Sequence, residues 1–142
     1  MEKSLSLKKY PDFVRFHLPA LVWMVFIFAL SSVPGPVLAP IEFPYAHLIA
    51  HLLLYSMLYY LFYRALGHEQ FSPFLRRSRI AAALVFVAVW GASDEYHQSF
   101  TPGRTPEVKD FLIDISAALI VLIVIALANH KSHGTKEISG SI

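Results

Sequence analysis

Ionisable side chains are concentrated between residues 94 and 104, at the end of the apolar run of residues 80–91. The sequence of this stretch, DEYHQSFTPGR, contains two acids, a histidine, a glutamine and an arginine. An ionisable group at the centre of a membrane costs about 2.5–3.5 kcal/mol. Such groups at the end of a membrane helix therefore need water, a partner or a function, and the stretch is a candidate for ligand binding or acid–base chemistry.

Asp94 and Glu95 allow two interpretations. They can act as a general acid–base pair, in which case His51 or His97 carries the second proton. Alternatively, Arg104 holds one of the two carboxylates in a bidentate ion pair that fastens two helices together. The same guanidinium is also suited to a phosphate or carboxylate group of a ligand at the membrane surface.

His47 and His51 have the one-turn spacing of paired metal ligands on a helix. Together with Glu95 and Asp110 they are candidates for a zinc or manganese site. The alternative is a pair of helix-end histidines that hydrogen-bond to carboxylates or to water. The sequence lacks the His-Glu-x-x-His signature, and many acids compete for one role. We therefore favour no metal ion at this stage, and the sequence identifies no cofactor.

Composition predicts an integral membrane protein with an all-α fold. The 142 residues are 56% hydrophobic and 15% charged, and their mean hydropathy is +0.51. Soluble domains are about 45–50% apolar and about 25% charged. The absence of cysteine excludes disulfides, a thiol nucleophile and a cysteine-ligated metal. A net charge of +2 is too small to indicate a nucleic-acid partner.

Four apolar segments are each close to the roughly 20 residues that a helix needs to cross a bilayer. They cover residues 13–33, 45–66, 79–98 and 110–128. The expected organisation is a cytoplasmic segment (1–12), a four-helix transmembrane domain (13–128) and a flexible cytoplasmic tail (129–142). We expect the first segment to be retained and not cleaved as a signal sequence, because Pro40 would directly follow the cleavage-like site at Ala39.

Basic residues predict that both ends of the chain lie in the cytoplasm. Of the 12 Lys and Arg residues, only Arg104 and Lys109 lie between the third and fourth segments. The other ten lie near the chain ends or around the connection between the second and third segments. By the positive-inside rule this distribution predicts a multi-pass protein of the cell membrane with both termini inside.

This topology brings the candidate residues to the outer boundary of the membrane. There the second segment begins, the third ends and the fourth begins, and spacings of three or four residues align polar side chains on each helix. The residues concerned are His47, His51, Asp94, Glu95, His97, Gln98, Arg104, Asp110 and Asp114, with Tyr55 one turn below His51.

The chain resembles the VanZ-like family of membrane proteins over roughly residues 20–125. The matching features are Leu30-Ser31-Ser32, His51 with Tyr55, Asp94-Glu95-x-His97-Gln98-x-Phe100-x-Pro102-Gly103-Arg104, and Asp110 at the start of the last helix. Two positions depart from the family pattern. His47-Leu48 stands in place of an Asp-Lys pair, and Asp114-Ile115-Ser116-Ala117 in place of Asn-x-x-Gly. The family takes its name from a protein associated with resistance to the glycopeptide teicoplanin.

With this resemblance, the leading hypothesis is a VanZ-like protein that engages a lipid-linked cell-envelope component and affects susceptibility to glycopeptides. The expected partners are membrane lipids or a lipid-linked envelope precursor, and the expected ligand-binding residues are His51, Tyr55, Asp94, Glu95, Gln98, Arg104, Asp110 and Asp114. One alternative is an intramembrane hydrolase or transferase that acts on a lipid or its head group, by acid–base or metal-assisted chemistry. Its candidate catalytic residues are Asp94, Glu95, His51 and His97. A second alternative is a membrane scaffold in which the polar residues only fasten helices.

Overall fold

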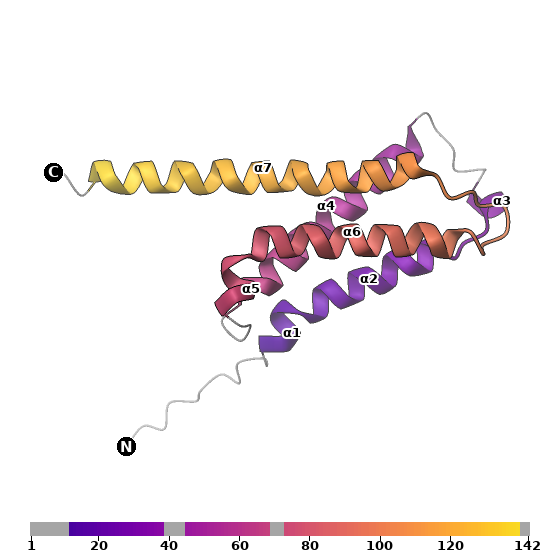
Figure 1. The fold of residues 1–142 in the computed structure, drawn as a ribbon, viewed down its shortest axis with the longest axis horizontal. Helices are drawn as coiled ribbons and strands as arrows, with labels where there is room; N and C mark the ends of the chain where they lie inside the picture. The colour runs from indigo at the N-terminus through magenta and orange to yellow at the C-terminus, as the bar shows by residue number, and fades with distance from the viewer. Residues whose placement is uncertain (1–11, 39–44, 69–72, 140–142) are drawn as a thin grey trace, which may run out of the picture.

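A computed structural model describes residues 12–38, 45–68 and 73–139, which form an elongated bundle of helices (Figure 1). The helices are α1 (Asp12–Phe16), α2 (Leu18–Ser31), α3 (Gly35–Leu38), α4 (Ala46–Leu66), α5 (Pro73–Arg77), α6 (Arg79–Gln98) and α7 (Val108–Ser139). These ranges contain no β-strand, which confirms the predicted all-α fold. The segment 1–11 and the cleavage-like site at Ala39-Pro40 lie outside the described residues.

The central helix of the bundle is α4, which packs against α7, α6 and α2. Its largest buried side chains are Tyr55, Leu58 and Tyr59, and they join Ile27 of α2 and Val87 of α6 in one apolar core. When water is the reference state, burial of one such side chain contributes about 1.5–3 kcal/mol to the free energy of folding. In a membrane the same contacts depend on close packing instead.

Small residues provide that close packing between α6, α7 and α4. Ala83, Val87 and Gly91 are buried and recur at every fourth position along one face of α6. On α7, Ala117 and Ala118 are fully buried. Short side chains let helix backbones approach, so that van der Waals contact holds the helices together.

The first predicted segment is divided into α1 and α2 at His17. Pro19 has no N–H group, so it cannot donate to the carbonyl of Arg15 one turn before it. Arg64 of α4 donates a side-chain hydrogen bond to this free carbonyl. A neighbouring helix therefore takes up the backbone acceptor that the proline leaves unused, as is common in membrane helices.

Among the described residues, two helices are long and apolar enough to cross a membrane: α4 and residues 108–130 of α7. The apolar helix α2 is shorter, with 14 residues. Valines at positions 22 and 25 of α2 and 85 and 89 of α6 are more than half exposed. Apolar side chains on the outside of α2 and α6 are what a surface in contact with lipid requires.

The last helix, α7, extends to Ser139, beyond residue 128, the expected end of the fourth segment. No proline follows Pro106 in the sequence, so no residue forces the helix to end. The predicted tail of residues 129–142 is thus helical as far as residue 139.

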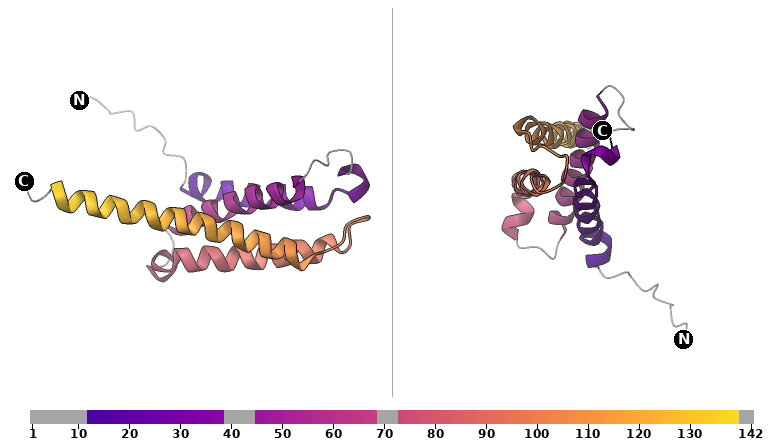
Figure 2. Two further views of the ribbon diagram at one scale, coloured as in Figure 1. Left: turned by 90° about the horizontal axis from the view of Figure 1, so that it is seen from above. Right: turned by 90° about the vertical axis from the view of Figure 1, so that its right-hand side faces the viewer.

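The arrangement of the helices gathers the polar residues at one end of the bundle. The ends of α2 and α6 and the starts of α4 and α7 lie near α3, whereas α1, α5 and the C-terminal part of α7 lie at the opposite end (Figures 1 and 2). Helices that are remote in sequence can therefore contribute side chains to a common site.

Candidate functional site

A pocket of about 1080 Å³ lies at the end of the bundle where α2 and α6 end and α4 and α7 begin. Part of its wall is apolar and includes Ile27, Leu54 and Ile113. Seven of the predicted site residues line the pocket: His47, His51, Tyr55, Asp94, Gln98, Arg104 and Asp110. Small-molecule sites commonly have such a wall, in which a few polar groups interrupt an apolar surface.

The carboxylate of Asp94 is held by hydrogen bonds on both of its oxygens. Ser31 at the end of α2 lies 2.5 Å from Oδ1, and the Gln98 side-chain amide donates to Oδ2 over 3.0 Å. All three side chains are buried. Asp94 thus joins α6 to α2, and this geometry favours a positioning role over that of a free base. Ser31 belongs to the Leu30-Ser31-Ser32 family motif, but nothing in the sequence predicted it as the partner of Asp94.

Glu95 connects α6 to the start of α7. Its Oε2 atom accepts a hydrogen bond of 2.9 Å from the backbone N–H of Glu107, the residue before α7. The carboxylate is thus placed at the positive end of the α7 dipole, where negative charge is favoured. Its other oxygen, Oε1, is buried and has no hydrogen-bond partner among the described residues.

A buried pair of side chains links α4 to α7. Nδ1 of His51 lies 2.8 Å from Oδ1 of Asp114, and Asp114 is completely buried. A Cβ atom at Gly91 of α6 would lie 3.2 Å from Oδ2 of Asp114, so the glycine makes room for the carboxylate. One turn towards the end of the bundle, Nδ1 of His47 lies 3.5 Å from Oδ1 of Asp110.

The Tyr55 hydroxyl lies near the carboxylates of Asp94 and Asp114. Its ring is parallel to that of His51, with 6.0 Å between the ring centroids. The hydroxyl is buried beside these two carboxylates. A buried donor next to two acids is a group that a ligand or a water molecule can engage.

Arg104 does not form the predicted bidentate pair with Asp94 or Glu95: no ion pair in the described ranges joins it to either acid. Its Nε atom donates to the carbonyl of Val33 over 3.2 Å, and an Nη atom donates to the carbonyl of Leu30 over 3.3 Å. Carbonyl groups at the end of a helix lack partners within the helix and lie at its negative end, which attracts a cation. The arginine therefore caps α2 and leaves the two acids to other partners.

The turn that carries Arg104 is fixed against the end of α2. Thr101 donates to the carbonyl of Ser31 over 3.3 Å, and the N–H of Gly35 donates to the carbonyl of Pro102 over 3.1 Å. Gly103 has a φ of +73°, a conformation that side chains other than glycine rarely adopt. The turn and the start of α3 are in close contact because both carry glycine at their nearest approach.

The structure places His97 away from the group around His51. Its Nε2 atom lies 3.0 Å from the Ser32 hydroxyl, and its ring stacks on Phe28 with the centroids 4.2 Å apart. Both partners belong to the end of α2 and the residue that follows it. His97 is thus a contact between α6 and α2, and the geometry favours His51 over it as a proton carrier beside Glu95.

Comparison with known proteins identifies one family. The VanZ/LLP1 family model matches residues 16–129, a region that includes every residue of the site described above. No curated protein and no solved structure matches the chain significantly.

Proposed function

The chain belongs to the VanZ/LLP1 family, and from this premise we propose that its pocket binds the anionic head group of a lipid-linked cell-envelope component. The family and the two long apolar helices indicate a membrane protein. In the proposed topology α2, α4, α6 and α7 cross the cell membrane and both termini are cytoplasmic. The distribution of Lys and Arg supports this orientation, which places the pocket at the outer leaflet.

The mixed wall of the pocket carries this proposal. A lipid-linked precursor joins an apolar chain to a polar, anionic head, and the wall offers apolar residues beside Arg104, His47 and Gln98. Arg104 uses two of its N–H groups on the carbonyls of Leu30 and Val33, and a guanidinium has five. The remaining donors can contact a phosphate or a carboxylate of the ligand.

Binding of an envelope precursor would also account for an effect on susceptibility to glycopeptides such as teicoplanin. Such drugs act outside the membrane, on the side where the proposed topology places the pocket. A protein that holds the precursor there changes how much of it the drug can reach.

A second candidate function is acid–base catalysis on a lipid or its head group. It is favoured by the buried oxygen of Glu95 that has no partner among the described residues, because a general base needs a free lone pair. In this function His51 carries the second proton.

If the polar residues only fasten helices, as in a scaffold, Glu95→Ala should lower thermal stability without changing the affinity for any ligand.

Binding of a polyprenyl diphosphate to the purified full chain in nanodiscs tests the proposal. We expect the wild type to prefer this lipid over phosphatidylcholine and Arg104→Ala to lose at least tenfold in affinity. Arg79→Ala, at the other end of α6, is the matched control and should bind as the wild type does. Absence of a preference in the wild type would refute the proposed ligand class, and unchanged binding by folded Arg104→Ala would refute the role of the arginine.

A further inference from the structure

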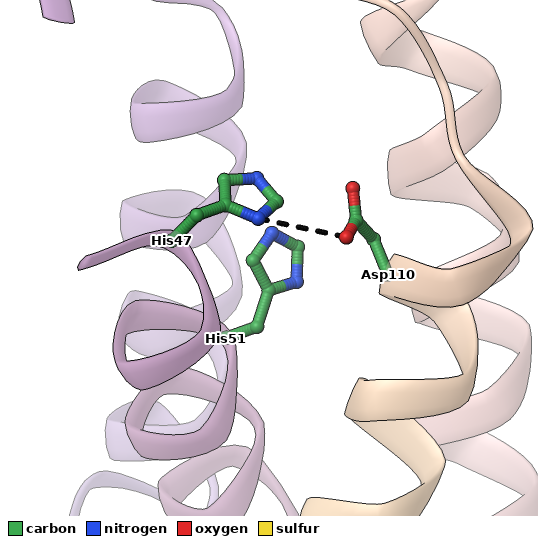
Figure 3. A group of neighbouring side chains, drawn as sticks. All are labelled: His47, His51 and Asp110. Carbon is green, nitrogen blue, oxygen red and sulfur yellow. Dashed lines mark ion pairs between the residues drawn. The ribbon is translucent and has the colours of Figure 1, made fainter. Parts of the chain in front are cut away.

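We propose that His47, His51 and Asp110 bind a divalent transition-metal ion of the zinc type at the mouth of the pocket. Ligand atoms of these three residues lie within 4.8 Å of one another. Figure 3 shows both imidazole rings on α4 turned towards the carboxylate of Asp110 on α7. Imidazole nitrogen and carboxylate oxygen are the donors that zinc takes in sites without cysteine.

The spacing of the donors fits one ion. Donor atoms at 2.0–2.2 Å from a tetrahedral zinc ion lie roughly 3.3–3.6 Å from each other. Nδ1 of His47 and Oδ1 of Asp110 are 3.5 Å apart. This distance is too long for a strong hydrogen bond, but it matches the edge of a zinc tetrahedron. The ligand atom of His51 lies within 4.8 Å of those of His47 and Asp110.

His51 is oriented for this role by a carboxylate behind it. Its Nδ1 atom is engaged by Asp114 at 2.8 Å, which leaves Nε2 as the available ligand atom. Metal-binding histidines usually donate their second ring N–H to a carboxylate or carbonyl, which fixes the tautomer and the direction of the ring. Asp114 is completely buried and makes this contact from α7, so it acts as a positioning residue.

The surrounding charges favour a cation. Oε1 of Glu95 and Oδ2 of Asp114 are buried without a hydrogen-bond partner among the described residues. The two basic residues that line the pocket are engaged elsewhere: Arg104 with the carbonyls of α2 and Lys109 with Glu107 at 2.5 Å. A bound divalent ion would balance the acids at this end of α7.

Three protein ligands would leave a fourth position of the ion open. Zinc sites of this kind hold water or substrate in that position, whereas structural sites have four protein ligands. His47 and Asp110 line the pocket, so the open position would face its interior. Contact between the ion and an anionic head group rests on the function proposed above, but binding of the ion itself does not.

Metal binding is tested on the full chain in detergent, with affinity tags removed and metal stripped by a chelator. We expect Zn²⁺ titration to show one site per chain and Co²⁺ to give the visible absorption of a low-coordinate site. His47→Gln should weaken Zn²⁺ binding at least tenfold and change the Co²⁺ spectrum. This residue is half exposed, with 52% of its side chain accessible, so the variant should fold. His97→Gln is the matched control and should bind like the wild type.

The positioning role of Asp114 is tested in the same titration. Asp114→Asn keeps the size of the side chain but not its charge, and loss of such a supporting carboxylate typically weakens metal binding 10–100-fold. A wild type that binds no Zn²⁺ at one per chain would overturn the proposal, as would equal affinity in His47→Gln and the wild type. These titrations contain no lipid ligand, so their failure is separate from failure of the proposed lipid binding.

Discussion

The buried pair of His51 and Asp114 permits a quantitative test of how the polar residues hold the bundle together. The Asp114 side chain is completely buried, and its hydrogen bond in the described part of the chain comes from Nδ1 of His51 over 2.8 Å. His51→Phe keeps an aromatic ring against Tyr55 but removes the donor. Breaking a buried ion pair by removing one partner costs about 3–5 kcal/mol. We expect that loss in the free energy of unfolding.

Removal of both partners should be much less harmful than removal of the histidine alone. Asp114→Leu alone leaves a buried ring nitrogen without a partner, which costs about 1–3 kcal/mol. In the double variant His51→Phe/Asp114→Leu no buried polar group is left unpaired, and replacement of a buried pair by apolar groups is often nearly neutral. The sum of the two single-variant losses in the free energy of unfolding should therefore exceed the loss in the double variant by at least about 2 kcal/mol.

The assay is reversible unfolding in mixed micelles of increasing SDS fraction, followed by circular dichroism in the presence of a chelator. His97→Phe is the control, because its partner is the exposed hydroxyl of Ser32, and we expect a loss below about 1 kcal/mol. Additive losses in the double variant, or a loss below about 1 kcal/mol for His51→Phe, would show that the pair does not stabilise the contact between α4 and α7.

Three further predictions concern packing and topology. Gly91→Val should lower the free energy of unfolding by about 1–3 kcal/mol in the same assay, because α6 closely approaches the buried carboxylate of α7 at this glycine. Gly103→Ala should lower it by about 1–2 kcal/mol because of the positive φ, whereas Gly67→Ala would meet only a flexible side-chain end at its closest contact and should cost less. The chain has no cysteine, so single cysteines can report which side of the membrane a residue faces. Ser99→Cys should react with a membrane-impermeant thiol reagent in intact cells, and Phe74→Cys should react only after permeabilisation. The reverse pattern would contradict the proposed orientation.

The positions of the long helices could be predicted from the sequence, because apolar runs and their flanking proline and glycine residues mark them. The runs 45–66 and 79–98 correspond to α4 (Ala46–Leu66) and α6 (Arg79–Gln98). The break before α2 was not predicted, because it depends on a partner for the carbonyl of Arg15 that only tertiary structure provides. A local pattern indicates that a proline lacks a donor but not whether a neighbouring helix compensates.

That many of the candidate residues gather at one end of the bundle could be predicted from the sequence, but the contacts between them could not. Orientation and helix spacing indicated that His51 and Asp114 lie at the same end of the bundle, and the structure brings them into contact. The ion pair of Arg104 with Asp94 or Glu95, one of the alternatives that the sequence left open, is absent from the described residues, because the arginine donates to the carbonyls of Leu30 and Val33 instead. Which acid meets which donor depends on the rotation of each helix about its axis, which no spacing in one chain specifies.

The capping of α2 by the turn after α6 has a consequence for how the protein assembles. The hydrogen bonds from Thr101 and Arg104 to the end of α2 join residues that are 70 to 74 positions apart in the chain. At synthesis rates of about 5–20 residues per second, the end of α2 leaves the ribosome about 4 to 14 seconds before its partners. During that interval the carbonyls of Leu30, Ser31 and Val33 lack the donors that Thr101 and Arg104 later provide. The helix α2 is therefore synthesised early, but its contacts with the turn after α6 form late. The pocket is complete only after the start of α7 has been synthesised.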